Sequence, residues 1–252
     1  MRVRTRSTLA AAFAAAALAV LPATAGAAGF PLVGWWPMNE GSGQVVRDWS
    51  GHGNNGTLGD SAAVDSHDPS WIPGVFAGSA LRFGGDDYVS IPDSSSLEPS
   101  KLTVAAWVRG TTSPGPFSYV VAKGATDCAS GSYGLYTGDT GGLAFYIGDG
   151  TQSYSRSPQA PASIWDGKWH HAAGTFDGNT VRLYVDGQEI GDGTPATSTL
   201  SYAPAGGGFI GDYHGSCDLY FVGDVDGVQV WSQALPVDDI WRFLRSLFST
   251  SR

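Results

Sequence analysis

The sequence predicts an all-β protein, a sandwich of two antiparallel sheets with one short C-terminal helix. Glycine supplies 36 of the 252 residues, and the chain also holds 9 Trp, 10 Tyr and 11 Phe. This composition favours short strands joined by tight turns. Residues 181–185 alternate Val, Leu and Val with Arg and Tyr, which is the period of a strand with one buried face. Only residues 237–247 are expected to form a short helix.

Residues 1–27 have the features of a secretory signal peptide. Arg2, Arg4 and Arg6 give a positively charged start, and residues 9–21 form an apolar run that is too short to span a bilayer. Small residues at positions 23–27 offer cleavage sites. The sequence therefore predicts a secreted, extracellular protein with no membrane span in its mature part.

The mature chain is predicted to be strongly acidic. Three of the 14 basic residues lie in the signal segment, so 11 basic residues remain against 23 acidic ones and the net charge becomes −12. Nucleic acid and anionic membranes are poor partners for such a surface. Only three of the acidic residues are glutamates, and the excess of aspartate is typical of turns and oxygen-rich loops.

The first half of the chain is expected to open with a strand at residues 32–37, which ends at a proline. Residues 60–79 contain prolines and glycines and are interpreted as a loop. Residues 81–92 are interpreted as a hairpin about a Gly-Asp turn. Residues 102–108 alternate in the manner of a strand.

The second half is organised around residues 169–187, which read WHHAAGTFDGNTVRLYVDG. Asp177-Gly178-Asn179 separates two strand segments, and Asp186-Gly187 marks the next turn, because Gly and Asn tolerate the backbone conformations that hairpin turns need. Residues 151–166 are polar with prolines and are expected to form a surface loop. Further strands are expected at residues 119–124, 133–136, 143–147, 206–212 and 219–231.

Five motifs resemble those of laminin G-like domains, a family of concanavalin A-like jelly rolls. They read DWSGHGNNGTL from residue 48, LRFGGDDYVSIP from 81, LTVAAWV from 102, WHHAAGTFDG with LYVDG from 169, and GDVDGVQVWSQAL from 223. They occur in the family's order. The resemblance implies one jelly-roll domain over residues 30–245, and it implies the role that is commonest in the family, a secreted carbohydrate-binding or adhesive module.

The loop that begins at Asp48 is rich in oxygen ligands of the kind that Ca²⁺ prefers. In the family that this chain resembles, a structural calcium ion commonly joins this loop to an aspartate of the last strand. The resemblance therefore implies a Ca²⁺ site made of Asp48, the carbonyl of Gly53, Asn54, Asn55 and Asp226. In the alternative interpretation these are ordinary turn residues, and backbone amides satisfy Asp226.

In a regular last strand Asp224 and Asp226 would share a face with Val228 and Val230, which would direct both carboxylates toward the core if that face is buried.

The chain has two cysteines, Cys128 and Cys217. An even pair in an exported chain usually forms a disulfide, which would stabilise the fold by roughly 4–5 kcal/mol in the chain-entropy model. A metal site is the alternative, and His214 is its one nearby partner in the sequence.

Aromatic residues gather in the middle third of the chain and beyond. Rings of this kind serve as platforms for sugars when they are exposed, although most aromatic residues of a sandwich belong to its core. The candidate ligand-binding residues are Tyr133, Tyr136, Tyr146, Tyr154, Trp165, Tyr213 and His214.

The sequence shows no paired acid and base. None of Glu40, Glu98 and Glu189 lies in the closely spaced carboxylate run of the concanavalin-like glucanases, and His170 and His171 lie within a strand. We therefore expect a monomeric, non-catalytic binding module whose partner is a glycan. The alternatives are a glycan-active enzyme, either a polysaccharide lyase or a glycoside hydrolase, and a structural surface protein that binds another protein.

The expected disulfide has a direct test. Free-thiol titration of the unfolded, non-reduced mature protein should find no reactive thiol, because Cys128 and Cys217 are paired. Two reactive thiols would contradict the pairing.

Overall fold

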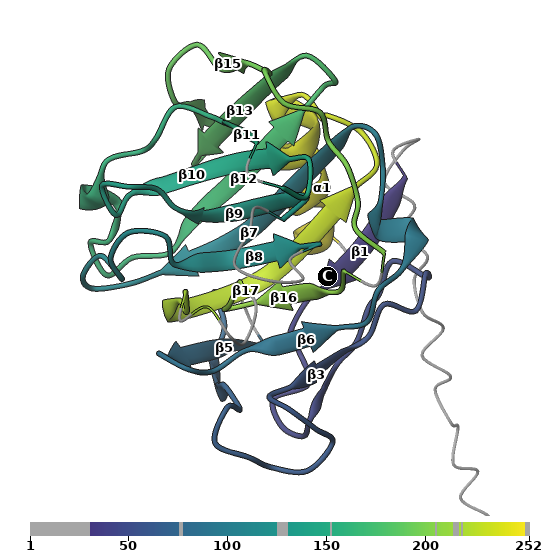
Figure 1. The fold of residues 1–252 in the computed structure, drawn as a ribbon. Coiled ribbons are helices and arrows are strands. Elements are labelled where there is room, and N and C mark those ends of the chain that lie inside the picture. Colours follow the sequence, from purple (N-terminus) through teal and green to yellow (C-terminus); the bar gives the residue numbers. More distant parts are fainter. Residues whose placement is uncertain are drawn as a thin grey trace, which may run out of the picture.

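The structure is a computed structural model that describes residues 31–75, 78–124, 131–151, 153–204, 206–213, 217 and 219–249. Two antiparallel sheets face each other across one main hydrophobic core, and a single α-helix, α1 (Val237–Ser249), packs on the outer side of one of them (Figure 1). This arrangement confirms the predicted two-sheet sandwich and its short C-terminal helix. The predicted signal segment, residues 1–27, lies outside the described residues.

The first sheet has nine strands. Its main order is β14-β13-β12-β7-β17-β5-β4, with β1 also paired to β17 and β15 also paired to β13. The strands are β1 (Leu32–Trp36), β4 (Ser70–Pro73), β5 (Ser79–Gly84), β7 (Leu102–Arg109), β12 (His170–Phe176), β13 (Thr180–Val185), β14 (Gln188–Glu189), β15 (Thr194–Pro195) and β17 (Val222–Trp231).

The second sheet has eight strands in the order β11-β10-β9-β8-β16-β6-β3-β2. Two short 3₁₀ helices, at Ser95–Leu97 and Ala162–Ile164, lie in the connections. The strands are β2 (Val45–Val46), β3 (Gly56–Leu58), β6 (Val89–Ile91), β8 (Tyr119–Lys123), β9 (Tyr133–Thr137), β10 (Leu143–Gly148), β11 (Tyr154–Arg156) and β16 (Gly208–Ile210).

The predicted meander of residues 169–187 is confirmed. Strands β12 and β13 pair with Gly174 opposite Leu183, and β12 also pairs with β7. Gly174 faces the second sheet, where Phe145 of β10 lies against it. A Cβ atom added to Gly174 would come within 2.0 Å of Cγ of Phe145, so the two sheets pack closely at this point only because residue 174 has no side chain.

The interpretation of residues 81–92 as a hairpin is wrong. Strand β5 pairs with β4 and β17 in the first sheet, whereas β6 pairs with β3 and β16 in the second. The turn between them therefore carries the chain from one sheet to the other. A hairpin and a turn that crosses between two sheets share the same local pattern, two apolar segments about a glycine turn. They differ only in the strands with which each segment pairs, which the local pattern does not show. Short strands also form within the segments expected to be loops, at β4 and β11.

The last strand contains a bulge that changes which residues face the core. The pairing with β7 shifts between Asp226 and Gln229, and Gly227 between them adopts a φ of 56°. One extra residue is thereby accommodated, as in other β-bulges. Val225 and Val228 consequently both join the core, while Asp226 lies on the outer face of the sheet. The two carboxylates of the last strand therefore do not point into the space between the sheets.

Gly174→Ala should lower the free energy of unfolding by about 1–3 kcal/mol, because the added methyl group overlaps the Phe145 ring in a filled core. Urea denaturation measures the loss. Gly208→Ala in β16 is the matched control, since its added Cβ would meet atoms no closer than 3.5 Å. Equal stability of the two variants would contradict the close approach of the sheets at Gly174.

Candidate functional site

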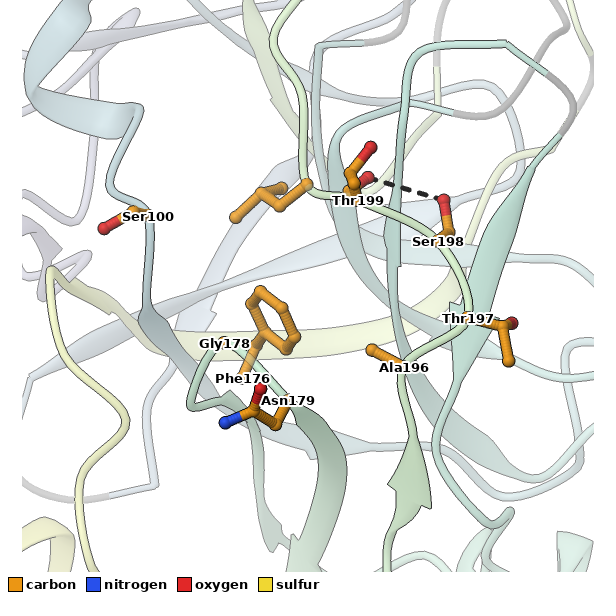
Figure 2. Close-up of a pocket in the computed structure, with 9 residues that line it drawn as sticks. Ser100, Phe176, Gly178, Asn179, Ala196, Thr197, Ser198 and Thr199 are labelled. Atoms are coloured by element: carbon orange, nitrogen blue, oxygen red, sulfur yellow. Dashed lines mark hydrogen bonds between the residues drawn. The ribbon is translucent and has the colours of Figure 1, made fainter.

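A pocket of about 430 Å³ lies where β7 begins and β12 ends (Figure 2). Its walls come from the β12–β13 turn and from the segment that follows β15. The lining residues are Ser100, Phe176, Gly178, Asn179, Ala196, Thr197, Ser198, Thr199 and Leu200.

Local hydrogen bonds hold the β12–β13 turn that forms one wall. The carboxylate of Asp177 accepts hydrogen bonds from the backbone N–H groups of Asn179 and Thr180, both at 2.8 Å. Gly178 adopts a φ of 97°, which few other residues tolerate. The turn is thus fixed by the carboxylate of Asp177 and by the backbone freedom of Gly178.

The opposite wall is the segment of residues 196–200, which joins the two sheets. Ala196 donates its N–H to the carbonyl of Asn179 at 2.7 Å, beside the β13–β15 pair of the first sheet. Thr197 and Ser198 donate their N–H groups to the hydroxyl of Ser155, in β11 of the second sheet. These hydrogen bonds fix one end of the wall, and the other end is held by the N–H of Ser201, which donates to the carbonyl of Gly148 in β10 at 3.1 Å.

The lining combines an apolar surface with neutral polar groups. Phe176, Ala196 and Leu200 belong to the main core or pack against it, and Figure 2 shows the Phe176 ring lying between the β12–β13 turn and the 196–199 segment. Asn179 and Thr199 are exposed, and within the described part of the chain their side chains make no hydrogen bond. None of the described lining residues is titratable. A lining of this composition can pack on the apolar parts of a ligand and can donate hydrogen bonds to its polar groups or accept them.

Four of the predicted aromatic ligands lie on the side of the second sheet that faces away from the main core. Tyr136, Tyr146 and Tyr213 are buried with Tyr119 in a separate cluster over β8, β9 and β10, and the rings of Tyr119 and Tyr213 are 4.5 Å apart. Tyr154 contacts this cluster edge-on and is 51% exposed. The buried members pack against one another, so only Tyr154 presents a ring to solvent.

The other predicted aromatic ligands do not reach the surface. Tyr133 and Trp165 belong to the main core; the hydroxyl of Tyr133 donates to the carbonyl of Leu97 at 3.2 Å, and the indole of Trp165 donates to the carbonyl of Gly141 at 2.8 Å. Their assignment as ligand-binding residues is therefore corrected. His214 lies outside the described residues.

The pocket residues were missed in the sequence. The run Ala196-Thr197-Ser198-Thr199 carried no prediction, since small hydroxyl residues are typical of loops. The feature that could have indicated a binding site is that residues 196–199 hold several uncharged hydrogen-bonding groups in a chain that is otherwise strongly acidic. The sequence pattern could not show that this segment closes onto the end of β12.

The Asp48 loop is held together by its own hydrogen bonds. One carboxylate oxygen of Asp48 accepts from the N–H groups of Trp35 and Ser50, and the other accepts from the Ser50 hydroxyl and the N–H of Asn54. The Asn55 side-chain oxygen accepts from the N–H of Asp48. Four donors occupy Asp48, so a calcium ion there would have to displace some of them.

Asp226 makes its contacts elsewhere. Its side chain accepts from the N–H of Val75, in the turn between β4 and β5, at 2.9 Å. The residue is 6% exposed, and this burial raises the pKa of its carboxyl to about 6. Gly53 adopts a φ of 78° within the Asp48 loop. Asp48 and Asp226 share no hydrogen-bond partner. The oxygens of Asp48 are already occupied by four donors, which does not fit the calcium site that was expected there. The ion that the resemblance implies stays a prediction.

The described part of the chain holds one other group of potential metal ligands. One ligand atom from each of Asp60, Asp65 and His67 lies within 4.8 Å of the other two. His67 already shares a 2.8 Å contact with Asp60, and Tyr88 also donates to Asp60. Hydrogen bonds within the group account for its geometry without an ion.

Of the residues that could serve in catalysis, His170 and Asp224 are held by charged partners, whereas the ring of His171 is buried against Trp107 and Trp241. His170 lies between Asp186 and Asp166, at 2.7 and 3.1 Å; burial opposes its protonation, but the two carboxylates outweigh this effect and raise its pKa. His171 is 2% exposed, and this burial lowers its pKa to about 4. Neither histidine lines the pocket.

Asp224 is the remaining catalytic candidate. Both of its oxygens accept hydrogen bonds from arginines, one from Arg82 at 2.7 Å and the other from Arg109 at 2.7 Å. The guanidinium of Arg109 lies in turn over the ring of Trp169 at 4.5 Å. Asp224 thus belongs to an ion-pair group that links three strands. Cys128 lies outside the described residues, so its pairing with Cys217 remains a prediction.

The fold is a two-sheet antiparallel β-sandwich, and the comparison with known families agrees. The chain belongs to the concanavalin A-like lectin/glucanases superfamily, whose family model matches residues 83–241. This confirms the resemblance to laminin G-like domains. Human neuronal pentraxin-2 is 27% identical over 151 residues, which is 55% of this chain. That match spans only 32% of the pentraxin's own length.

Solved structures share the jelly-roll fold at low sequence identity. Domain 4 of AbnA, an extracellular arabinanase of Geobacillus stearothermophilus solved with arabinotriose, superposes with a TM-score of 0.64 at 17% identity and covers 84% of this chain and 97% of its own. A Trypanosoma rangeli sialidase, solved with 2,3-difluorosialic acid, gives a TM-score of 0.57 at 17% identity over 83% of this chain and 32% of the sialidase. These likenesses show the fold.

The ionisation of Asp226 should be visible in the pH dependence of stability. Its pKa in the folded protein lies above the ordinary carboxyl value. The stability that the protonated carboxyl gives the folded protein is therefore lost as the pH rises through about 6. Asp226→Asn keeps an acceptor for Val75 and removes the charge. At pH 8 the variant should be more stable than wild type, by up to roughly 3 kcal/mol of unfolding free energy, and its melting temperature should be higher. The difference should shrink at pH 4.5, where the wild-type carboxyl is protonated.

The same measurement separates the two accounts of this carboxylate. Wild-type melting should not change with EDTA if hydrogen bonds alone hold Asp226. A melting temperature that EDTA lowers, together with an Asp226→Asn variant less stable than wild type at pH 8, would show that a cation neutralises this carboxylate.

Proposed function

We propose that this protein is a secreted, non-catalytic carbohydrate-binding module. The observation that carries the proposal is the lining of the pocket at the end of β12, which combines an apolar surface with neutral hydrogen-bonding groups and has no titratable member among the described residues. Sugars offer hydroxyl groups that both donate and accept hydrogen bonds, and C–H faces that pack on apolar side chains. A site of this composition suits binding and supplies neither acid nor base.

The comparisons support a carbohydrate as the ligand. The chain's family is described by its lectins and glucanases, and AbnA domain 4, which superposes over almost its whole length, was solved with arabinotriose. The signal-like composition of residues 1–27 supports export, which would bring the domain into contact with extracellular glycans.

An enzyme on the same scaffold is the main alternative, because the sialidase is among the structural neighbours. The arrangement of the charged groups favours binding instead. His170 is held between two carboxylates, and both oxygens of Asp224 are engaged by arginines. A catalytic pair would need one group poised to donate a proton beside another poised to accept it, at a shared cavity.

The mature protein should retain glycans on an array of neutral and acidic oligosaccharides and should release no reducing ends or unsaturated products from the polysaccharides that contain them. The retained glycans and the product assay are measured on the same preparation. Failure to retain any glycan would contradict the binding role, and turnover of a retained glycan would establish an enzyme.

A further inference from the structure

We infer that the pocket between the β12–β13 turn and residues 196–200 is the glycan site, and that its ligand is a neutral sugar residue. The inference rests on the proposed function and adds to it the place and the chemical class of the ligand. In this arrangement the C–H face of the sugar packs on the apolar surface of Phe176, Ala196 and Leu200, while its hydroxyls meet Asn179 and Thr199.

The volume suits a short ligand. At about 430 Å³ the pocket lies near the lower end of the range for small-molecule sites, which is about 300–1,000 Å³. A terminal sugar residue fits such a space, whereas a long polysaccharide segment needs an extended groove. The anchored walls also favour binding, because little ordering of the backbone remains to oppose it.

The polar groups match hydroxyls. The amide of Asn179 offers both a donor and an acceptor, and the hydroxyl of Thr199 can take either role. Ser198 donates to the carbonyl of Ser153 at 3.0 Å, which leaves its oxygen able to accept. A sugar hydroxyl placed here can therefore exchange its hydrogen bonds with water for hydrogen bonds with the protein, which avoids the cost of unpaired polar groups.

The charges around the pocket argue against an acidic sugar. None of the described lining residues is basic, so a uronic or sialic carboxylate inside it would lose water without gaining a positive charge to pair with. Lys101 and Arg182 are the cations near this turn, since both act on Asp177. Lys101 is exposed, with its Cε 3.4 Å from a Cβ added to Gly178, and Arg182 is paired with Glu189 at 3.4 Å. One exposed lysine contributes little. The net charge of −12 expected for the mature chain adds a general repulsion toward polyanions.

Calorimetric titration with defined oligosaccharides tests the inference. The neutral probes are arabinotriose, xylotriose and cellotriose, and the acidic probes are trigalacturonate and sialyllactose. Wild type should bind at least one neutral probe more tightly than either acidic probe. Its affinity should change by less than about two-fold between 50 and 500 mM NaCl, since no ion pair is involved.

Two variants locate the site. Thr199→Trp places an indole at the pocket and should weaken binding of the neutral probe more than about ten-fold, and Asn179→Ala should weaken it about five-fold through the loss of one hydrogen bond. Thr112→Ala, at an exposed position away from the pocket, is the matched control and should bind as wild type. Thermal melting of each variant confirms that the fold is retained.

Each contrary result has a distinct meaning. Neutral-sugar binding that survives both variants unchanged would overturn the site and leave the proposed function standing. Binding of the acidic probes alone would overturn the ligand class. No binding of any probe, neutral or acidic, would overturn the inference, and an empty glycan array would then overturn the proposed function as well.

Discussion

The close packing of Phe145 on Gly174 is the contact on which the arrangement of this sandwich depends. It sets the separation of the two sheets near the middle of β12, because a side chain at residue 174 would force them apart. Two residues further along the same face of β12 lies Phe176, which ends the strand and becomes part of the pocket. The position of the candidate site is therefore a consequence of how the core is packed.

The pocket also depends on the connection that bridges the sheets. Residues 196–200 leave the edge of the first sheet hydrogen-bonded to Asn179 and reach the second sheet hydrogen-bonded to Ser155. The main core fills the interior between the sheets, and the hollow described here lies at an end of the sandwich, where strands stop and connections begin. Function on such a scaffold resides in the connections, which can vary without disturbing the core.

The sequence predicted the architecture better than the site. Strong alternation in residues 181–185 and the Asp177-Gly178-Asn179 turn predicted the β12–β13 hairpin, because that information is local. The pairing of residues 81–92 was not local, so the same kind of pattern produced a wrong hairpin. The side-chain alternation of the last strand failed at Gly227, where a bulge places Asp226 and Val228 on opposite faces of the sheet.

The functional residues were harder to predict because aromatic rings serve both cores and sugar sites. Tyr133 and Trp165 proved to be core residues, and Tyr136, Tyr146 and Tyr213 pack against one another, while the neutral groups of residues 196–199 gave only a weak signal. Similarly, the carboxylate oxygens of Asp48 in the oxygen-rich loop already accept hydrogen bonds from backbone N–H groups. Residue type alone does not reveal whether a side chain is already engaged.

The most direct test of the central claim is a nuclear magnetic resonance titration of the mature protein with arabinotriose. The account predicts that the side-chain amide of Asn179 and the backbone amides of residues 196–199 shift as the sugar is added, while signals from β10 and β11 around Tyr154 stay in place. Shifts centred on Tyr154 and its neighbours, with residues 196–199 unchanged, would contradict the account and move the ligand to the tyrosine face.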